Sequence, residues 1–420
     1  MRKKEKPEKK IPANRYLPIA FFSDLWYNEK QENMRTGPQK SGNGSLAVER
    51  LLMSMNALLH MSHAYGANAE FVLAGGGNTS AKDGDVMYIK GSGTQLATIT
   101  ADGFVKMNRQ SLADIFTKEY PTDDDAREAQ ALADLSAARM PGEESKRPSV
   151  ETLLHSLFPY TFVLHVHPAL VNGLTCAVNG KAEAERLFGD GFIWVESCKP
   201  GYTLSKICYD KMTAYMAEHG KAADMLLLQN HGIFIAADTA EAIGDKLADV
   251  MSKLNAAVVR WPDFDSGDYD GEKAQKCFDV IYEVYGDDAV ITYEPSAEAL
   301  KFAESSETAQ AVMKPFTPDH IVYCKAEPVY GFCNGCIKGA VNKYFEEKGY
   351  MPKIIIISGC GFFAVDMTPK GSDTAATLFN DALKVATYSE SFGGPLPMTD
   401  ELSDFITNWE VESYRQKQNA

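Results

Sequence analysis

Apolar residues recur at helical spacing from Val48 onward. Positions 48, 51, 52, 55, 58 and 59 are all valine, leucine or methionine, and Gly66 follows them as a stop signal. The same period predicts a second helix that begins with Ser149 as its N-cap and is closed by Pro159. A third, longer helix is expected over about Thr239–Val259.

Short apolar runs between glycine-containing or polar segments predict the strands. The expected strands are Phe71–Ala74, Val86–Lys90, Phe162–Val166, Met225–Leu228 and Ile233–Ala236. The polar residues 75–85 between the first two runs predict turns. An acidic, alanine-rich stretch, residues 122–147, predicts an exposed helix followed by a linker.

The chain has 420 residues, which is enough for two or three domains with proper cores. An acidic, tyrosine-containing stretch, residues 263–270, is the expected boundary. We therefore divide the chain into a basic N-terminal tail and extension (1–40), a first domain (41–265) and a second domain with its own strands and helices (266–420).

The charge balance excludes some classes of partner. Lysine and arginine number 42 against 57 acidic residues, and a net charge of −15 repels polyanions, so we expect no nucleic-acid partner. No run approaches the roughly 18 to 20 apolar residues of a membrane helix, so we expect no membrane partner either. The first ten residues hold six basic side chains and no apolar stretch follows them directly, which does not support a secretory signal.

Eight cysteines at irregular spacing are typical of reduced thiols rather than of a disulfide framework. Cys333 and Cys336 form a lone Cys-x-x-Cys pair, which cannot complete a tetrahedral metal site by itself. We therefore expect a cytoplasmic protein.

Three histidines are candidate metal ligands. His165 and His167 alternate along a predicted strand, so they project from one face, and His231 stands at the end of another strand where a glycine turn begins. Three neutral imidazoles with an open fourth position form a catalytic type of zinc site. The alternative is a packed or surface histidine pair without a metal.

Glu151 lies near the start of the helix that Ser149 opens. If that helix end faces the metal, Glu151 is a candidate general acid or base. The alternative is a carboxylate that only interacts favourably with the helix dipole.

Two glycine turns are candidate anion sites. Gly75–Ser80 combines three glycines with Asn78, Thr79 and Ser80, and Gly91–Thr94 adds further hydroxyl groups. Neither turn ends in the Gly-Lys-Ser/Thr of a nucleotide P-loop, so a small phosphate fits better than a nucleotide. The alternative is a pair of flexible turns.

Five motifs in this order resemble the class II aldolase/adducin family of sugar-phosphate aldolases and epimerases. They are Gly77-Asn78-Thr79, Ser92-Gly93-Thr94, Ser149-Val150-Glu151, His165-Val166-His167 and Asn230-His231-Gly232. The resemblance covers about residues 45–260. The remainder is similar to the aldolase portion of bifunctional rhamnulose-1-phosphate aldolase/alcohol dehydrogenases, and the dehydrogenase domain of those proteins is expected to be missing.

The resemblance implies an α/β fold, namely an α/β/α sandwich around a mostly antiparallel sheet, with a smaller C-terminal α/β domain. It also implies residue roles: His165, His167 and His231 bind Zn²⁺ or another divalent transition metal, and Glu151 is the acid/base group. The phosphate of the substrate would be held by Gly77, Asn78, Thr79, Ser92, Gly93 and Ser149. Val150 departs from the family, whose fuculose-phosphate members carry a hydroxyl residue there, so phosphate binding is less secure than metal binding.

The activity implied by this resemblance is cleavage of a ketose 1-phosphate, of the rhamnulose or fuculose type, into dihydroxyacetone phosphate and an aldehyde. Family members form cyclic tetramers, so a homo-oligomer is expected. Epimerisation, decarboxylation or dehydration on the same metal site is the alternative within the family. A non-catalytic, adducin-like scaffold is the alternative outside catalysis.

The second half contains a segment similar to one in the first half. At an offset of 129 positions, Met225–Ala236 falls on Ile354–Val365, and Cys360 falls on His231. The glycines at 359 and 361 do not predict a dinucleotide site, because a strand rather than a helix is expected after them. We hypothesise a degenerate, metal-free repeat of the first domain, which a different strand order in the second sheet would contradict.

Overall fold

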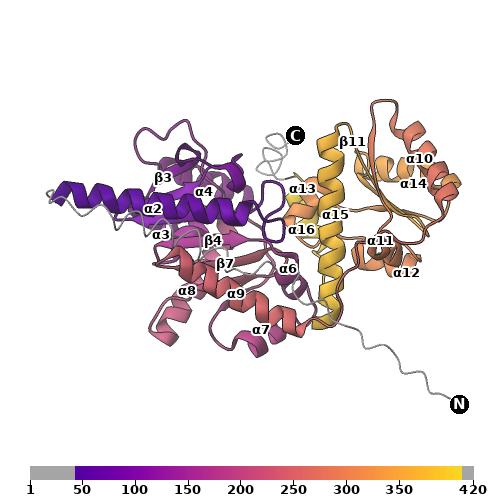
Figure 1. Cartoon of the computed structure of the whole chain (residues 1–420). Helices are drawn as coiled ribbons and strands as arrows, with labels where there is room; N and C mark the ends of the chain where they lie inside the picture. Colours follow the sequence, from indigo (N-terminus) through magenta and orange to yellow (C-terminus); the bar gives the residue numbers. More distant parts are fainter. Residues whose placement is uncertain (1–42, 409–420) are drawn as a thin grey trace, which may run out of the picture. The chain divides into compact units, whose positions relative to one another are not determined.

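The computed structural model describes residues 43–408 (Figure 1). The predicted tail and extension, residues 1–40, lie outside this range. The chain divides into two units between Leu52 and Met53, and both β-sheets belong to the second unit. The first predicted helix is confirmed as α2 (Asn43–Gly66). Within the described residues, no helix is both long enough and apolar enough to cross a bilayer.

A seven-stranded sheet forms the centre of the first half. Its order is β3-β2-β1-β4-β7-β6-β5, and every neighbouring pair is antiparallel except β5 with β6. The strands are β1 (Asn78–Asp83), β2 (Val86–Lys90), β3 (Phe104–Asn108), β4 (Phe162–Val166), β5 (Ile193–Val195), β6 (Met225–Leu228) and β7 (Gly232–Ala237). The predicted mostly antiparallel sheet is therefore confirmed.

Helices cover both faces of this sheet because apolar side chains alternate along its strands. On β7, Phe234 and Ala236 enter a core with α5 and α8, while Ile233 and Ile235 point to the opposite face, where α6 and α9 lie. The helices of this half are α3 (Arg109–Thr117), α4 (Asp124–Ala137), α5 (Thr152–Leu157), α6 (Ala169–Thr175), α7 (Gly180–Phe188), α8 (Tyr202–His219) and α9 (Ala240–Ala257). Two short 3₁₀ turns, η1 (Leu96–Thr98) and η2 (Ala101–Gly103), precede β3.

The sequence-based prediction of the first strand is wrong. The apolar run Phe71–Ala74 is not a strand, and β1 occupies the polar segment that we expected to form turns. Its polar side chains are buried because each has a partner, which hydropathy alone does not reveal. The Thr79 hydroxyl bonds the Ser62 hydroxyl (2.7 Å), the Ser80 hydroxyl bonds the His155 ring (2.8 Å) and the Lys82 ammonium donates to the Tyr160 carbonyl (3.2 Å).

Buried Lys82 predicts an unusual dependence of stability on pH. Burial, aided by the positive charge of Arg109, lowers the pKa of Lys82 to about 7. Unfolding restores the ordinary value near 10.4, so between these two values the unfolded chain holds more protons and stability rises with pH. The free-energy cost of burying Lys82 is largest below pH 7 and disappears above pH 10.4. We expect roughly 2 kcal/mol of additional stability between pH 7 and pH 9 from Lys82.

Urea unfolding of the wild type and of Lys82→Met at these two pH values measures this contribution. The wild type should gain more stability with rising pH than the variant, since Lys82→Met removes the titrating group. The same pH dependence in both proteins would contradict the prediction.

The second half contains a four-stranded sheet of order β8-β11-β10-β9. Its strands are β8 (Val290–Glu294), β9 (Val329–Gly331), β10 (Ile354–Ile357) and β11 (Gly361–Asp366). α10 (Gly271–Tyr285) and α14 (Asn334–Lys348) pack on one face, and the long helix α15 (Pro369–Ser389) packs on the other (Figure 1). Shorter helices are α11 (Ala297–Phe302), α12 (Ser306–Ala309), α13 (Pro318–Cys324) and α16 (Asp400–Asn408), with 3₁₀ turns η3 (Gln310–Val312) and η4 (Glu390–Phe392). The predicted smaller α/β part is confirmed.

The small sheet has the connectivity of one half of the large sheet. The order β8-β11-β10-β9 corresponds to β4-β7-β6-β5, and in both sets only the last pair is parallel. The hairpin registers also agree, because Met225 pairs with Ile235 and Ile354 pairs with Ala364 at an offset of 129. The strand order therefore does not contradict the repeat hypothesis. The strand predicted after Gly361 is β11.

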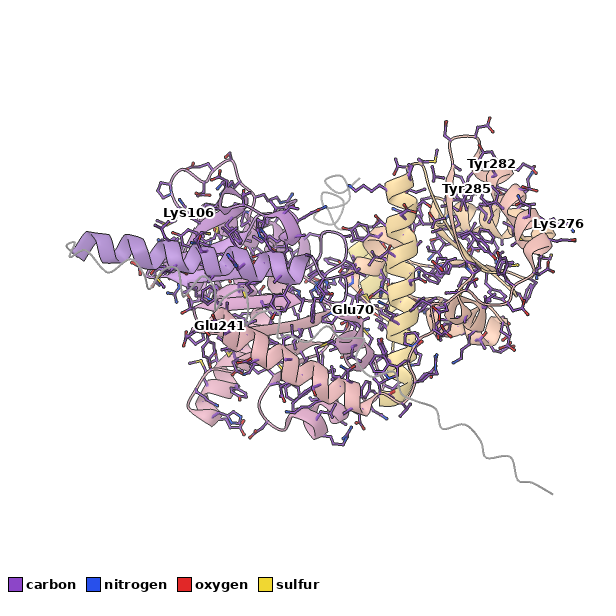
Figure 2. All side chains as sticks on the ribbon, viewed as in Figure 1. Glu70, Lys106, Glu241, Lys276, Tyr282 and Tyr285 are labelled. Atoms are coloured by element: carbon purple, nitrogen blue, oxygen red, sulfur yellow. The ribbon has the colours of Figure 1, made fainter. Side chains whose placement is uncertain are left out.

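Helix α15 also packs against α6 of the first half. Near it, the Lys384 ammonium lies 3.4 Å from the carboxylate of Glu70, which precedes β1 (Figure 2). Arg260 lies in the segment that connects the two sheets, and its guanidinium binds Glu298 of α11 and Glu390 of η4. The domain boundary near residue 265 stays a prediction.

Candidate active site

The three predicted histidines converge at one end of the large sheet. His165 lies on β4, His167 follows the end of this strand, and His231 lies in the tight turn between β6 and β7. β4 pairs with β7, so the turn is brought beside the end of β4. One ligand nitrogen from each ring lies within 4.8 Å of the other two.

The turn that carries His231 depends on its neighbours. Asn230 adopts a left-handed conformation (φ 58°), which asparagine tolerates better than most residues, and its side-chain amide donates to the Leu396 carbonyl (2.8 Å). Gly232 leaves room for the His167 ring, since a Cβ there would lie 2.7 Å from the Cδ2 atom of that ring. The Asn-His-Gly sequence thus lets His231 and His167 approach each other.

Hydrogen bonds fix which nitrogens of two rings face the centre. The Nδ1 atom of His165 lies 2.9 Å from the Ile233 carbonyl, and Nδ1 of His167 lies 2.6 Å from a carboxylate oxygen of Asp319. Both partners accept, so each Nδ1 carries the proton and each Nε2 carries a lone pair.

These two Nε2 atoms are 2.9 Å apart, with lone pairs facing each other. A cation between them removes the repulsion. Two nitrogens that each bind one zinc ion at about 2.0 Å in tetrahedral geometry lie about 3.3 Å apart, so a small outward shift accommodates the ion. The three histidines therefore fit a divalent metal.

Glu151 faces the same centre. Its Oε1 atom is buried without a hydrogen bond and lies 3.1 Å from Nε2 of His165 and 3.2 Å from Nε2 of His231. The Asn78 amide donates to Oε2. An orphaned carboxylate oxygen among imidazole nitrogens is a second feature that fits a cation, and it leaves Oε1 available to a substrate proton.

Burial and charge set the protonation states of this cluster. Burial lowers the pKa of His165 to about 4, so this ring is neutral near pH 7, as a metal ligand must be. Burial alone would raise the pKa of Glu151, but the imidazoles of His165 and His231 outweigh it and hold the pKa well below its ordinary value. Glu151 is therefore a carboxylate at neutral pH.

The predicted role of Ser149 as an N-cap is wrong. α5 begins at Thr152, and Glu151 occupies the cap position without a capping hydrogen bond from its side chain. The Ser149 hydroxyl instead accepts from the Glu151 N–H (3.2 Å). The turn ahead of the helix thus leaves the Glu151 carboxylate free to point at the histidines.

An open cleft adjoins the histidines. Most of the predicted site residues line it: Gly77, Asn78, Ser92, Gly93, Ser149, Glu151, His167 and His231. Gly77 has a positive φ of 69° and passes close to the His165 carbonyl, where a Cβ would lie 3.0 Å away. The two predicted glycine turns therefore meet in one cleft, beside the candidate metal site.

Two of the predicted residues do not line the cleft. Thr79 points to the opposite face of β1, where its hydroxyl bonds Ser62, because successive side chains of a strand alternate. His165 is fully buried behind the other two histidines and stacks on Phe234, with ring centroids 3.9 Å apart.

Two charged residues of the cleft were missed by sequence reasoning. Lys90 ends β2 directly before the Gly91–Thr94 turn, and its buried side chain lines the cleft, with its ammonium 3.4 Å from the Gly75 carbonyl. A lysine between a strand and a glycine turn is a signal that could have been used. Asp319 belongs to α13 in the second half, and nothing in its local sequence points to the histidines.

Comparison with known proteins finds a curated relative and several solved structures. The chain is 25% identical over 414 residues to the "Uncharacterized oxidoreductase YuxG" of Bacillus subtilis (strain 168), covering 87% of this chain. The chain spans only 58% of the length of that relative.

Two similar solved structures cover about half of this chain. The N-terminal class II aldolase domain of a conserved protein from Thermoplasma acidophilum is 24% identical, covering 53% of this chain and 96% of its own, with a TM-score of 0.41. L-fuculose-1-phosphate aldolase from Thermus thermophilus is 16% identical, covering 48% and 91%, with a TM-score of 0.30.

A family comparison covers the segment that carries the three histidines, Glu151 and both glycine turns. Residues 56–251 match the family described as the Class II Aldolase and Adducin N-terminal domain.

Proposed function

We propose that this protein is a metal-dependent lyase that cleaves a ketose 1-phosphate, of the rhamnulose or fuculose type, into dihydroxyacetone phosphate and an aldehyde. The observation that carries the proposal is the convergence of three imidazoles and the unpaired Glu151 oxygen at the edge of a cleft. The match of residues 56–251 to the aldolase and adducin family supports it.

His165, His167 and His231 would hold zinc or another divalent transition metal. Such an ion, when bound, acts as a Lewis acid on the carbonyl of the substrate. The histidines leave the cleft side of the centre open for that oxygen, as a catalytic site requires.

Glu151 would carry the proton of the reaction. A retro-aldol reaction breaks the bond between the α-carbon and the β-carbon of the ketose. The hydroxyl group on the β-carbon loses its proton, and the α-carbon gains a proton. The Oε1 atom, ionised and without a hydrogen bond, is placed to accept the first proton and return it. The Asn78 amide holds the other carboxylate oxygen and so fixes the orientation of the group.

The phosphate would bind at the glycine-turn end of the cleft. Gly77, Asn78, Ser92, Gly93 and Ser149 line this region, with Lys90 supplying a positive charge. The Thr79 side chain would not contact the phosphate, because its hydroxyl bonds Ser62 on the other face of β1. A single ammonium group with hydroxyl and N–H donors is sufficient for one phosphate despite the net charge of −15.

Lys90→Gln tests the phosphate end. We expect KM for the phosphorylated ketose to rise roughly 10- to 100-fold, because a hydrogen bond to a charged group contributes about 1.5 to 3 kcal/mol. Steady-state kinetics with the phosphorylated sugar measures it. Lys106→Gln is the matched control, since Lys106 lies on β3 (Figure 2). Its side chain is half exposed and does not line the cleft. An unchanged KM in Lys90→Gln would contradict the assignment.

Epimerisation, decarboxylation or dehydration would use the same histidines with other proton donors. Products decide between them: with rhamnulose 1-phosphate and ribulose 5-phosphate as substrates, only an aldolase releases dihydroxyacetone phosphate. An adducin-like scaffold would need neither metal nor Glu151, so a purified protein that binds no metal would favour it.

We further propose that the second half is a degenerate, metal-free repeat. At an offset of 129, Cys360 stands at the position of His231 and Phe363 at that of Phe234. The strand partner of Phe363 is Tyr293, whereas the strand partner of Phe234 is His165. The second half therefore has no imidazole at the positions of His165 and His231. The matching strand order and register support this proposal.

We also propose that the protein is a homo-oligomer, which sedimentation velocity tests. We propose a cytoplasmic location as well, and the eight free cysteines support it.

A further inference from the structure

We propose that Asp319, a residue of the second half, is a positioning residue for the metal ligand His167. The inference rests on the proposed metal site but not on the identity of the reaction. Asp319 stands on α13, 152 positions from His167 in the sequence, and one of its carboxylate oxygens lies 2.6 Å from Nδ1 of that ring. The residue is 5% exposed and lines the cleft.

A carboxylate on Nδ1 has two effects on a metal-binding imidazole. It holds the proton on Nδ1, so Nε2 keeps the lone pair that a metal needs, and it fixes the plane of the ring. His165 obtains the same tautomer from an uncharged acceptor, the Ile233 carbonyl at 2.9 Å. His167 is the more exposed of these two rings, so a charged and shorter hydrogen bond compensates for weaker packing.

The position of Asp319 is fixed from the metal side by the loop before β1. A Cβ at Gly76 would lie 3.1 Å from the carboxylate oxygen of Asp319 that contacts His167, so glycine gives this group its space. One turn further along α13, the hydroxyl of Tyr323 accepts from the Gly75 N–H at 3.3 Å. Two residues of α13 therefore meet the same glycine loop.

The other side of α13 is fixed by α15. His320 follows Asp319 and lies 3.2 Å from the Asp381 carboxylate, and the Cys324 thiol lies 3.3 Å from the Ala375 carbonyl. α13 is thus held between the glycine loop and the long helix of the second half. The second half supplies no metal ligand in this proposal. It nevertheless sets the orientation of the ligand His167 through Asp319.

Cobalt(II) binding by the full chain tests this role without any assumption about turnover. The chain is stripped of metal with a chelator and titrated with Co²⁺, whose absorption reports binding. We expect Asp319→Ala and the isosteric Asp319→Asn to weaken Co²⁺ binding roughly 10- to 100-fold, as loss of an outer-sphere partner of a ligating histidine does. If Asp319→Ala does not fold, the Co²⁺ affinity of Asp319→Asn alone tests the positioning role.

The matched control is Asp381→Asn. It removes the carboxylate from a second buried histidine on the same helix, His320, which does not line the cleft. The asparagine oxygen can still accept a hydrogen bond from His320, so α13 keeps its place and this variant should bind Co²⁺ as the wild type does. Thermal unfolding of the metal-free proteins reports any loss of stability in each variant.

The outcomes separate the two proposals. Equal Co²⁺ affinity in the wild type and Asp319→Asn overturns the positioning role and leaves the metal site intact. Equal weakening in Asp381→Asn overturns it as well, because the effect would then come from the helix rather than from contact with His167. A wild type that binds no Co²⁺ overturns the metal site and, with it, the role of Asp319.

Discussion

His167→Ala is expected to lose its bound metal and its activity together. The variant removes one of three converging nitrogens and leaves the His165 lone pair facing an empty space. Two imidazoles hold a divalent ion far more weakly than three, so we expect less than about one-tenth of the wild-type metal content after dialysis and a loss of turnover of at least about 100-fold.

Metal content per chain and turnover of a ketose phosphate measure this effect. His60→Ala is the control, because His60 is an exposed residue of α2 that does not line the cleft. Thermal unfolding of the metal-free proteins excludes a general loss of structure. A His167→Ala protein that retains stoichiometric metal would contradict the assignment of His167 as a metal ligand.

Glu151→Gln is expected to keep the metal and lose activity. The amide has the shape of the carboxylate but cannot accept the substrate proton, and general acid–base groups contribute roughly 100- to 10,000-fold. We therefore expect kcat to fall within that range. The metal content should remain near that of the wild type, because Glu151 is assigned to the proton and the histidines to the ion.

Turnover and metal content of the same preparation measure this separation. Glu241→Gln is the control, since Glu241 is an exposed acid in the first turn of α9 (Figure 2). Normal turnover by Glu151→Gln would remove the acid/base role. A joint loss of metal and activity would reassign Glu151 as a ligand.

The sequence predicted the histidine cluster because the features that form it are local. Alternation along a strand places His165 and His167 together, and the turn Asn230-His231-Gly232 is recognisable from its glycine. Their convergence depends on the pairing of β4 with β7, which follows from no local signal. The family resemblance, rather than spacing, supplied the expectation that all three histidines bind one metal.

The errors share one physical cause. β1 was missed, and Thr79 was assigned to the cleft, because the polar side chains of this strand are buried through partners such as Ser62 and His155. Asp319 could not be found because its role depends on a contact between residues 152 positions apart. Hydropathy describes single positions, and such pairs exist only after folding.

Release of dihydroxyacetone phosphate by the zinc-loaded full chain is the most direct test of the proposed activity. With rhamnulose 1-phosphate or fuculose 1-phosphate as substrate, we expect one dihydroxyacetone phosphate for each sugar consumed, loss of release on chelation and recovery with added zinc. Consumption of the sugar without this product, or release that persists after the metal is removed, would contradict a metal-dependent aldolase.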